Sequence, residues 1–116
     1  MADVLVDTNV FIDHLNGSRR FEPGEDRVWY SVVTRFELFA SKQVSEDVLQ
    51  LLLSPFTEIT IDRDVAERAG RLRRTLSIRT PDALIAASAL EYGLTLLTSN
   101  VKDFRTVPEL QISAPK

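Results

Sequence analysis

The chain alternates short apolar segments rich in β-branched residues with longer segments of helical periodicity, and this alternation limits the folds open to it. Extended segments are predicted at residues 3–7, 28–30, 57–61, 94–98 and 110–112. Helices are predicted between them, at residues 10–15, 32–40, 45–53, 63–75, 82–92 and 101–104. Strands separated by helices are typical of a parallel sheet covered on both faces. We therefore expect an α/β fold with a central, mostly parallel sheet of about five strands flanked by helices.

Several helix starts carry side chains that can accept a hydrogen bond from a free backbone N–H group. The predicted N-caps are Ser31, Ser45 and Asp62. Thr80 is predicted as a further N-cap, because the Pro81 that follows it is favoured at the first helical position. These capping residues predict where four of the helices begin.

Length and composition indicate one globular domain over residues 1–116, without a linker or repeat. The chain is 44% hydrophobic and 27% charged, which is outside the range of disordered proteins. The absence of cysteine excludes disulfides, thiolate metal sites and cysteine nucleophiles. Neither an apolar run of about 18–20 residues nor the start of a signal peptide is present. We therefore expect a cytoplasmic protein with no membrane association.

The net charge of -3 argues against a protein that holds nucleic acid mainly by overall basicity. To bind a polyanionic ligand, this acidic protein would need a positively charged group at the binding site that bridges the two. Five arginines lie between Arg68 and Arg79. They are typical either of a solvated helix face or of phosphate recognition, and the sequence leaves both readings open.

Four acids are predicted at the edge of the sheet where the strands end. Asp7 ends the first strand, and Asp103 follows the fourth within five residues. Asp82 and Glu37 lie on otherwise apolar helices, each on a face that it shares with apolar side chains. Ligands of parallel α/β sheets bind beyond the carboxyl ends of the strands, where the strand order reverses. The four carboxylates are therefore candidates for one site.

Each acid also has a purely structural interpretation. Asp7 and Asp103 can cap a helix or turn. Asp82 stabilises a helix start through the helix dipole by roughly 0.3–1 kcal/mol in any protein, and Glu37 can reach solvent or a neighbouring arginine.

A cluster of unpaired acids raises the free energy of the folded protein through charge repulsion, which favours the binding of a cation. Two unit charges 4 Å apart repel by roughly 4 kcal/mol at an effective dielectric constant of about 20. This repulsion can be relieved by proton uptake, by a basic partner or by a divalent cation. Oxygen ligands without cysteine and with a single histidine, His14, favour Mg²⁺ or Mn²⁺ over zinc. Such an ion can hold a substrate phosphate and activate water.

Other catalytic classes lack support. His14 has no serine or cysteine signature near it and is interpreted as a structural or surface residue. No G-x-S-x-G, P-loop or G-x-G-x-x-G pattern occurs, which leaves serine hydrolases, NTPases and dinucleotide enzymes without a motif.

Residues 5–13, 31–38, 81–87 and 97–104 read LVDTNVFID, SVVTRFEL, PDALIAA and LTSNVKDF. These four blocks, each with an acid, resemble the signature blocks of PIN-domain ribonucleases, and in particular of the small VapC-type toxins of toxin–antitoxin pairs. The likeness runs in order over residues 4–112.

The resemblance implies a PIN-like sheet flanked by helices, a pocket of acids that holds Mg²⁺ or Mn²⁺, and endonucleolytic cleavage of RNA. The residues that match the catalytic and metal-binding acids are Asp7, Glu37, Asp82 and Asp103. Those that match the supporting polar positions are Thr8, Asn9, Thr98 and Asn100. The resemblance also implies a structured RNA substrate such as tRNA, a cognate antitoxin protein as partner, and a homodimer.

The chain departs from many relatives in one stretch. Only 24 residues separate Glu37 from Asp62, where many relatives have a longer helical pair. That stretch commonly shapes the dimer and the antitoxin groove.

Three alternatives compete with the nuclease hypothesis. A catalytically inactive PIN-like module would bind RNA or protein without turnover. A phospho-acceptor receiver domain would need an acceptor acid that ends a central strand, whereas Asp62 is predicted as a helix cap. A haloacid-dehalogenase-type phosphatase would need a second acid two residues after Asp7, where Asn9 stands.

Overall fold

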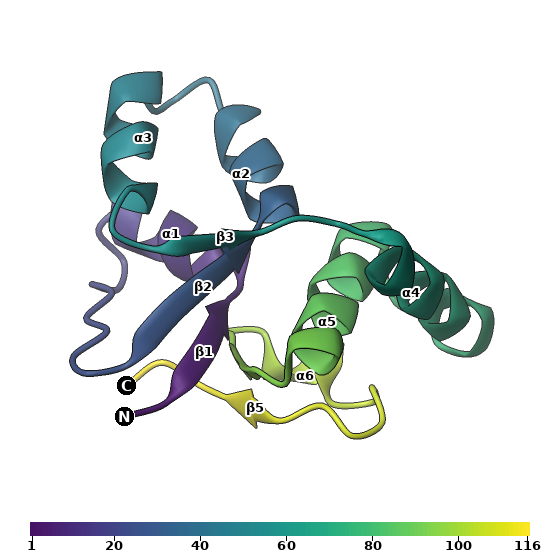
Figure 1. The fold of residues 1–116 in the computed structure, drawn as a ribbon. Helices are drawn as coiled ribbons and strands as arrows, with labels where there is room; N and C mark the ends of the chain where they lie inside the picture. The colour runs from purple at the N-terminus through teal and green to yellow at the C-terminus, as the bar shows by residue number, and fades with distance from the viewer.

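The sheet at the centre of the molecule has five strands in the order β3-β2-β1-β4-β5, and every neighbouring pair is parallel (Figure 1). A computed structural model describes all residues, 1–116. The strands are β1 (Asp3–Val6), β2 (Arg27–Ser31), β3 (Thr57–Ile59), β4 (Thr95–Leu97) and β5 (Ile112–Ser113). Because β1 lies between β2 and β4, the strand order reverses at β1 and β4. The predicted α/β fold with a parallel five-stranded sheet is confirmed.

Six helices cover the two faces of the sheet (Figure 1). They are α1 (Thr8–Leu15), α2 (Val32–Phe39), α3 (Glu46–Leu53), α4 (Arg63–Thr75), α5 (Thr80–Tyr92) and α6 (Val101–Phe104). The longest, α4 and α5, have 13 residues each, and none of the six has the length and apolar character that a membrane span requires.

Three of the predicted N-caps are confirmed. The hydroxyl of Ser31 accepts a hydrogen bond from the Val33 N–H, and that of Ser45 accepts one from the Val48 N–H. The carboxylate of Asp62 accepts one from Val65. The polar residue before each apolar run therefore determines where α2, α3 and α4 begin.

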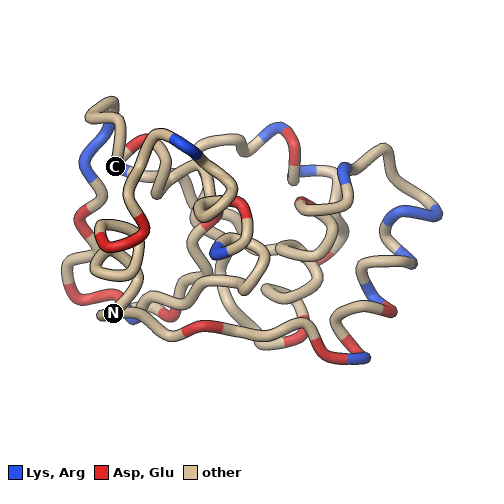
Figure 2. The backbone as a smooth tube through the Cα atoms, turned by 90° about the horizontal axis from the view of Figure 1, so that it is seen from above, with Lys and Arg blue, Asp and Glu red and all other residues tan.

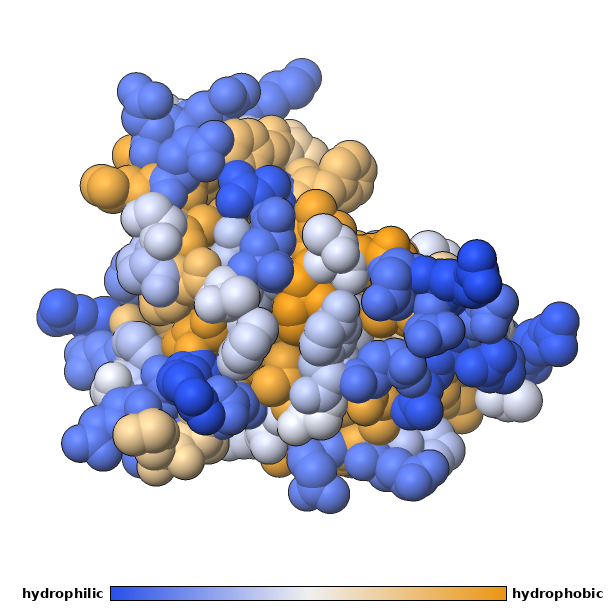
Figure 3. All heavy atoms as spheres, in the orientation of Figure 1, coloured by the Kyte–Doolittle hydropathy of each residue, from blue (hydrophilic) through white to orange (hydrophobic).

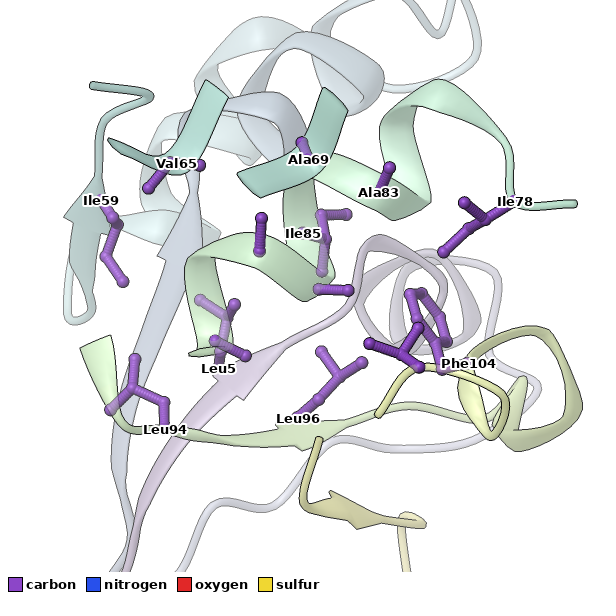
Figure 4. Packing of buried hydrophobic residues seen from close by; sticks show 14 residues of the cluster. Leu5, Ile59, Val65, Ala69, Ile78, Ala83, Ile85, Leu94, Leu96 and Phe104 are labelled. Atoms are coloured by element: carbon purple, nitrogen blue, oxygen red, sulfur yellow. The ribbon is translucent and has the colours of Figure 1, made fainter. Parts of the chain in front are cut away.

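The alternation of side chains along β1 divides the core in two. Leu5 belongs to a cluster formed with α4, α5 and α6, which includes Leu96 and Phe104 (Figure 4). Val4 and Val6 point to the other face, where α1, α2 and α3 pack. Because successive residues of a strand face opposite sides, a continuous apolar strand is required between two helical layers.

The second cluster is rich in aromatic side chains. The ring of Phe11 on α1 packs edge-on against those of Phe21 and Tyr30, and at a tilt against that of Phe56. The backbone N–H of Phe21 donates a hydrogen bond to Nδ1 of His14, at 3.0 Å. His14 therefore has the predicted structural role, since it ties the segment after α1 to this cluster.

One predicted cap is wrong. The N-cap of α5 is Arg79, and Thr80 is the first helical residue. The Thr80 hydroxyl accepts a hydrogen bond from Arg73 instead of from a helical N–H group, at 2.8 Å. Pro81 consequently occupies the second helical position, where it also leaves no helical hydrogen bond unmade.

Candidate active site

Asp7 lies at the carboxyl end of β1, where the strand order reverses. Its side chain is only 2% exposed. Its backbone N–H donates to the Leu97 carbonyl at 2.9 Å, and its Oδ2 accepts a hydrogen bond from the Thr98 hydroxyl at 2.8 Å. Asp7 is the N-cap of α1, but its carboxylate does not cap that helix. The carboxylate is therefore held by Thr98, the residue that follows β4, although Asp7 itself stands at the N-cap position that its structural interpretation predicts.

Burial raises the pKa of Asp7 from 3.8 to about 6. The hydrogen bond from Thr98 opposes this rise, whereas the negative charges of Asp82 and Glu37 add to it. Desolvation and like charge both disfavour the ionised carboxylate. In the protein alone, Asp7 is thus an acid held in an unfavourable environment.

Glu37 reaches the same edge from α2. Its Oε1 accepts a hydrogen bond from the Thr8 hydroxyl at 2.7 Å, and the oxygens of Thr8 and Thr34 lie 2.8 Å apart. Because Thr8 donates its single proton to Glu37, the buried Thr34 hydroxyl must donate to Thr8. These hydrogen bonds join α1 to α2 and fix the position of Oε1 of Glu37.

Asp82, in the first turn of α5, is half-buried. Burial raises its pKa, the positive charge of Arg79 opposes that rise, and the charges of Asp103 and Glu37 add to it. Asp103 is exposed on the short helix α6. Asp82 thus lies within electrostatic range of the other three acids.

The supporting polar residues are distributed unevenly around these acids. Thr8 and Thr98 are buried and donate to the acids described above, and the Asn100 backbone N–H donates to the Thr98 hydroxyl at 3.0 Å. Asn9 and the Asn100 side chain are half-buried and make no side-chain hydrogen bond of this kind. Sequence reasoning missed Thr34, although a threonine one turn before Glu37 on an apolar helix was an available signal.

The donor set at this edge consists of oxygen atoms, which suits Mg²⁺ or Mn²⁺. The raised pKa values of Asp7 and Asp82 show that burial and like charges disfavour the ionised acids, a penalty that a divalent cation would relieve. As the side chains stand, no group of three or more His, Asp or Glu residues is arranged to hold a metal ion. The chemistry of the donors therefore fits such an ion, provided that side chains such as that of exposed Asp103 move.

Comparison with known proteins settles the family. The model of the PIN domain family matches residues 4–110. The chain belongs to the PIN domain family. Ribonuclease VapC19 of Mycobacterium tuberculosis is a relative 34% identical over 121 residues, a match that covers 92% of this chain and 96% of the relative.

Solved structures of other proteins share this fold. One chain of a toxin–antitoxin complex from Klebsiella pneumoniae superposes with a TM-score of 0.81 at 35% identity, over 97% of this chain and 98% of that one. A chain of DNA-bound VapBC from Salmonella typhimurium superposes with a TM-score of 0.84 at 24% identity, over 98% of each. The first is close enough to make this PIN-domain protein a relative of a toxin–antitoxin component, and the second supports the fold alone.

Proposed function

We propose that this protein is a metal-dependent endoribonuclease, the toxin of a toxin–antitoxin pair, and that it acts on structured RNA such as tRNA. The observation that carries the proposal is the mutual charge interaction of Asp7, after β1, with Glu37 and Asp82, and of Asp82 with Asp103. The similarity to a protein named as a ribonuclease over 92% of the chain adds support.

In this proposal Asp7 and Asp82 are the leading ligands of Mg²⁺ or Mn²⁺, and Glu37 and Asp103 hold the ion or its waters. The ion, when bound, supplies charge neutralisation at the phosphodiester and activation of water. The protein positions the ligands: the Thr98 hydroxyl donates to Oδ2 of Asp7 and the Thr8 hydroxyl to Oε1 of Glu37, so the second oxygen of each carboxylate has no side-chain donor.

The reaction is a hydrolysis without a covalent enzyme intermediate. A water oxygen bonds to phosphorus, one P–O bond to ribose breaks, and the departing oxygen takes up a proton. The chain has no cysteine, and its one histidine, His14, accepts a hydrogen bond from the Phe21 N–H, which agrees with water as the nucleophile.

The proposed partners are an RNA substrate, a cognate antitoxin protein and a second copy of the chain. Support for the antitoxin comes from the Klebsiella pneumoniae complex, whose 35% identical chain belongs to a toxin–antitoxin assembly.

The test is incubation of purified protein with a tRNA pool and Mg²⁺ or Mn²⁺. We expect discrete cleavage products that disappear with EDTA and with Asp7→Asn or Asp82→Asn. The matched control is Asp47→Asn, which removes one exposed acid on α3 and should cleave like the native protein. Cleavage that persists in EDTA, or in both site variants, would refute metal-dependent catalysis by these acids.

A second candidate is a catalytically inactive PIN-like module that binds RNA or protein. The arrangement of the acids favours this candidate, because no three of them are placed to hold a metal ion together. The same experiment separates the two candidates: RNA binding without products across a broad RNA panel, with either metal present, would favour the binding module.

A further inference from the structure

Positive charge is concentrated at one end of the molecule. Residues 68–79 contain five arginines and no acid, whereas the chain as a whole carries a net charge of -3. In Figure 2, Lys and Arg recur along the end of the molecule where α4 lies. Figure 3 shows that the surface over α4 is mainly hydrophilic.

Only some of these arginines have a role within the fold. Arg68 forms an ion pair with Glu91 on α5, at 2.6 Å. Arg74 is exposed in the last turn of α4, where the helix dipole stabilises a cation, and Arg71 is exposed one turn earlier on the same helix. The ion pair and helix electrostatics therefore explain Arg68 and Arg74, and Arg71 lies on the exposed side of the helix, which suits a charged residue.

Arg79 is different. It is exposed, it takes part in none of the four ion pairs of the structure, and it is the N-cap of α5. The start of a helix is the positive end of its dipole, where a cation is disfavoured. Helix stability thus gives no reason for an arginine at this position.

The chain nevertheless holds the backbone of Arg79 firmly. The guanidinium of Arg73 donates from Nε to the Ile78 carbonyl at 3.1 Å and from Nη1 to the Thr80 hydroxyl at 2.8 Å. These two acceptors flank Arg79 on either side. Ile78 is buried in the core, and Pro81 restricts the backbone that follows. The backbone that connects α4 to α5 is therefore fixed on both sides of Arg79.

This connection adjoins the acidic site. Arg79 precedes Asp82 by three residues at the start of α5, a spacing that brings side chains onto one side of a helix. The positive charge of Arg79 also acts on Asp82, where it opposes the rise in pKa that burial causes. An unpaired guanidinium is thus located beside a site whose acids would otherwise repel a polyanion.

We propose that Arg79 is a substrate-binding residue that holds an RNA backbone phosphate at the rim of the acidic site, and that Arg73 is its positioning residue. The inference rests on the proposed ribonuclease function and deepens it. Guanidinium groups bind phosphate oxygens through paired N–H donors, which suits this role.

The experiment measures binding of a fluorescein-labelled tRNA by anisotropy, from 50 to 200 mM KCl, in the Asp7→Asn background that prevents turnover. Arg79→Gln is compared with Arg63→Gln, which removes the same charge at the other end of α4 from an exposed arginine without an ion pair. We expect Arg79→Gln to weaken binding about tenfold and to lower the salt slope by roughly one. Arg63→Gln should change affinity less than twofold.

Arg73→Ala tests the positioning role. It should reproduce the loss of affinity and of salt slope, and the double variant with Arg79→Gln should bind no more weakly than Arg79→Gln alone, because both changes remove one contact. An additive loss in the double variant would contradict the positioning role. Thermal melts of each variant establish that the fold is retained.

The inference is overturned if Arg79→Gln matches Arg63→Gln in both affinity and salt slope. If the native protein still cleaves RNA with Mn²⁺ in that case, the proposed function stands and only the role of Arg79 fails. If the native protein neither binds nor cleaves RNA, both the proposed function and the role of Arg79 are refuted.

Discussion

The buried carboxylate of Asp7 should make the metal-free protein less stable than a variant without that charge. The rise of its pKa from 3.8 to about 6 corresponds to roughly 3 kcal/mol, at about 1.4 kcal/mol per pKa unit. Asp7→Asn keeps an oxygen that can accept the hydrogen bond from Thr98. We therefore expect the variant to exceed the native protein in free energy of unfolding by about 3 kcal/mol at pH 8.

The pH dependence follows from the sign of the shift. Because the folded-state pKa of Asp7 is above the unfolded-state value, the penalty is present in full above about pH 6. Between about pH 6 and pH 3.8 the folded protein takes up a proton that the unfolded chain does not, so the native protein gains stability relative to the variant. The difference should nearly vanish at pH 4.

Urea and thermal unfolding in EDTA, followed by circular dichroism at pH 8 and pH 4, measure this difference. At about 2.1 cal/mol/K per residue, 3 kcal/mol in a chain of 116 residues corresponds to a rise in Tm of about 12 °C. The control Glu25→Gln neutralises an exposed acid and should follow the native protein at both pH values. A variant that is less stable than the native protein at pH 8, or a difference that does not depend on pH, would refute the reasoning.

Three further outcomes are expected. Mn²⁺ at ten times its Kd should stabilise the native protein by about 1.4 kcal/mol but not Asp7→Asn, in thermal melts that EDTA reverses; equal stabilisation of both would contradict a role for Asp7 as ligand. Thr98→Val removes the donor to Asp7 and the acceptor of the Asn100 N–H, and should cost about 1–3 kcal/mol in urea unfolding; an unchanged midpoint would show that neither bond matters. Phe11→Ala should cost about 3–5 kcal/mol, because its side chain is fully buried among aromatic rings, whereas Phe36→Ala, which alters a residue 71% exposed, should cost less than about 0.5 kcal/mol. Similar losses for both phenylalanines would contradict the assigned core.

Local signals explain why most helices could be predicted from the sequence. α4 begins directly after the Asp62 cap and ends at Thr75, as predicted, because both ends depend on nearby residues. The third strand was predicted over residues 57–61 but ends at Ile59. Its neighbour β2 pairs with it only as far as Ser31, which then leaves the sheet to cap α2. The length of an edge strand is thus set by its partner, and the sequence does not show that partner.

The last strand was predicted over residues 110–112 and is found at Ile112–Ser113. It is a two-residue edge strand, whose register is determined by β4 and not by its own composition. The short helix α6, by contrast, has the predicted bounds of Val101–Phe104.

Topology predicts one edge for Asp7 and Asp103, because both follow strand ends of a parallel sheet, whereas Glu37 and Asp82 lie on helices and were placed there from their faces. Their hydrogen-bond partners could not be assigned. The bond from Thr98 to Asp7 and that between Thr8 and Thr34 join residues far apart in sequence, and no local pattern encodes them. The arginine run predicts a helix face or a phosphate-binding segment, but its spacing does not show that Arg79 stands at the N-cap of α5, three residues before Asp82.

The hydrogen bond between Asp7 and Thr98 spans 91 positions of the chain, which has a consequence for synthesis on the ribosome. A nascent chain exposes Asp7 and Glu37 early, but it cannot form β4 or bring Asp82 and Asp103 alongside them until most of its length has emerged. A product released before residue 94 lacks that strand and leaves the Asp7 carboxylate without its donor. Translation that stops early therefore yields fragments in which the acidic site is never assembled.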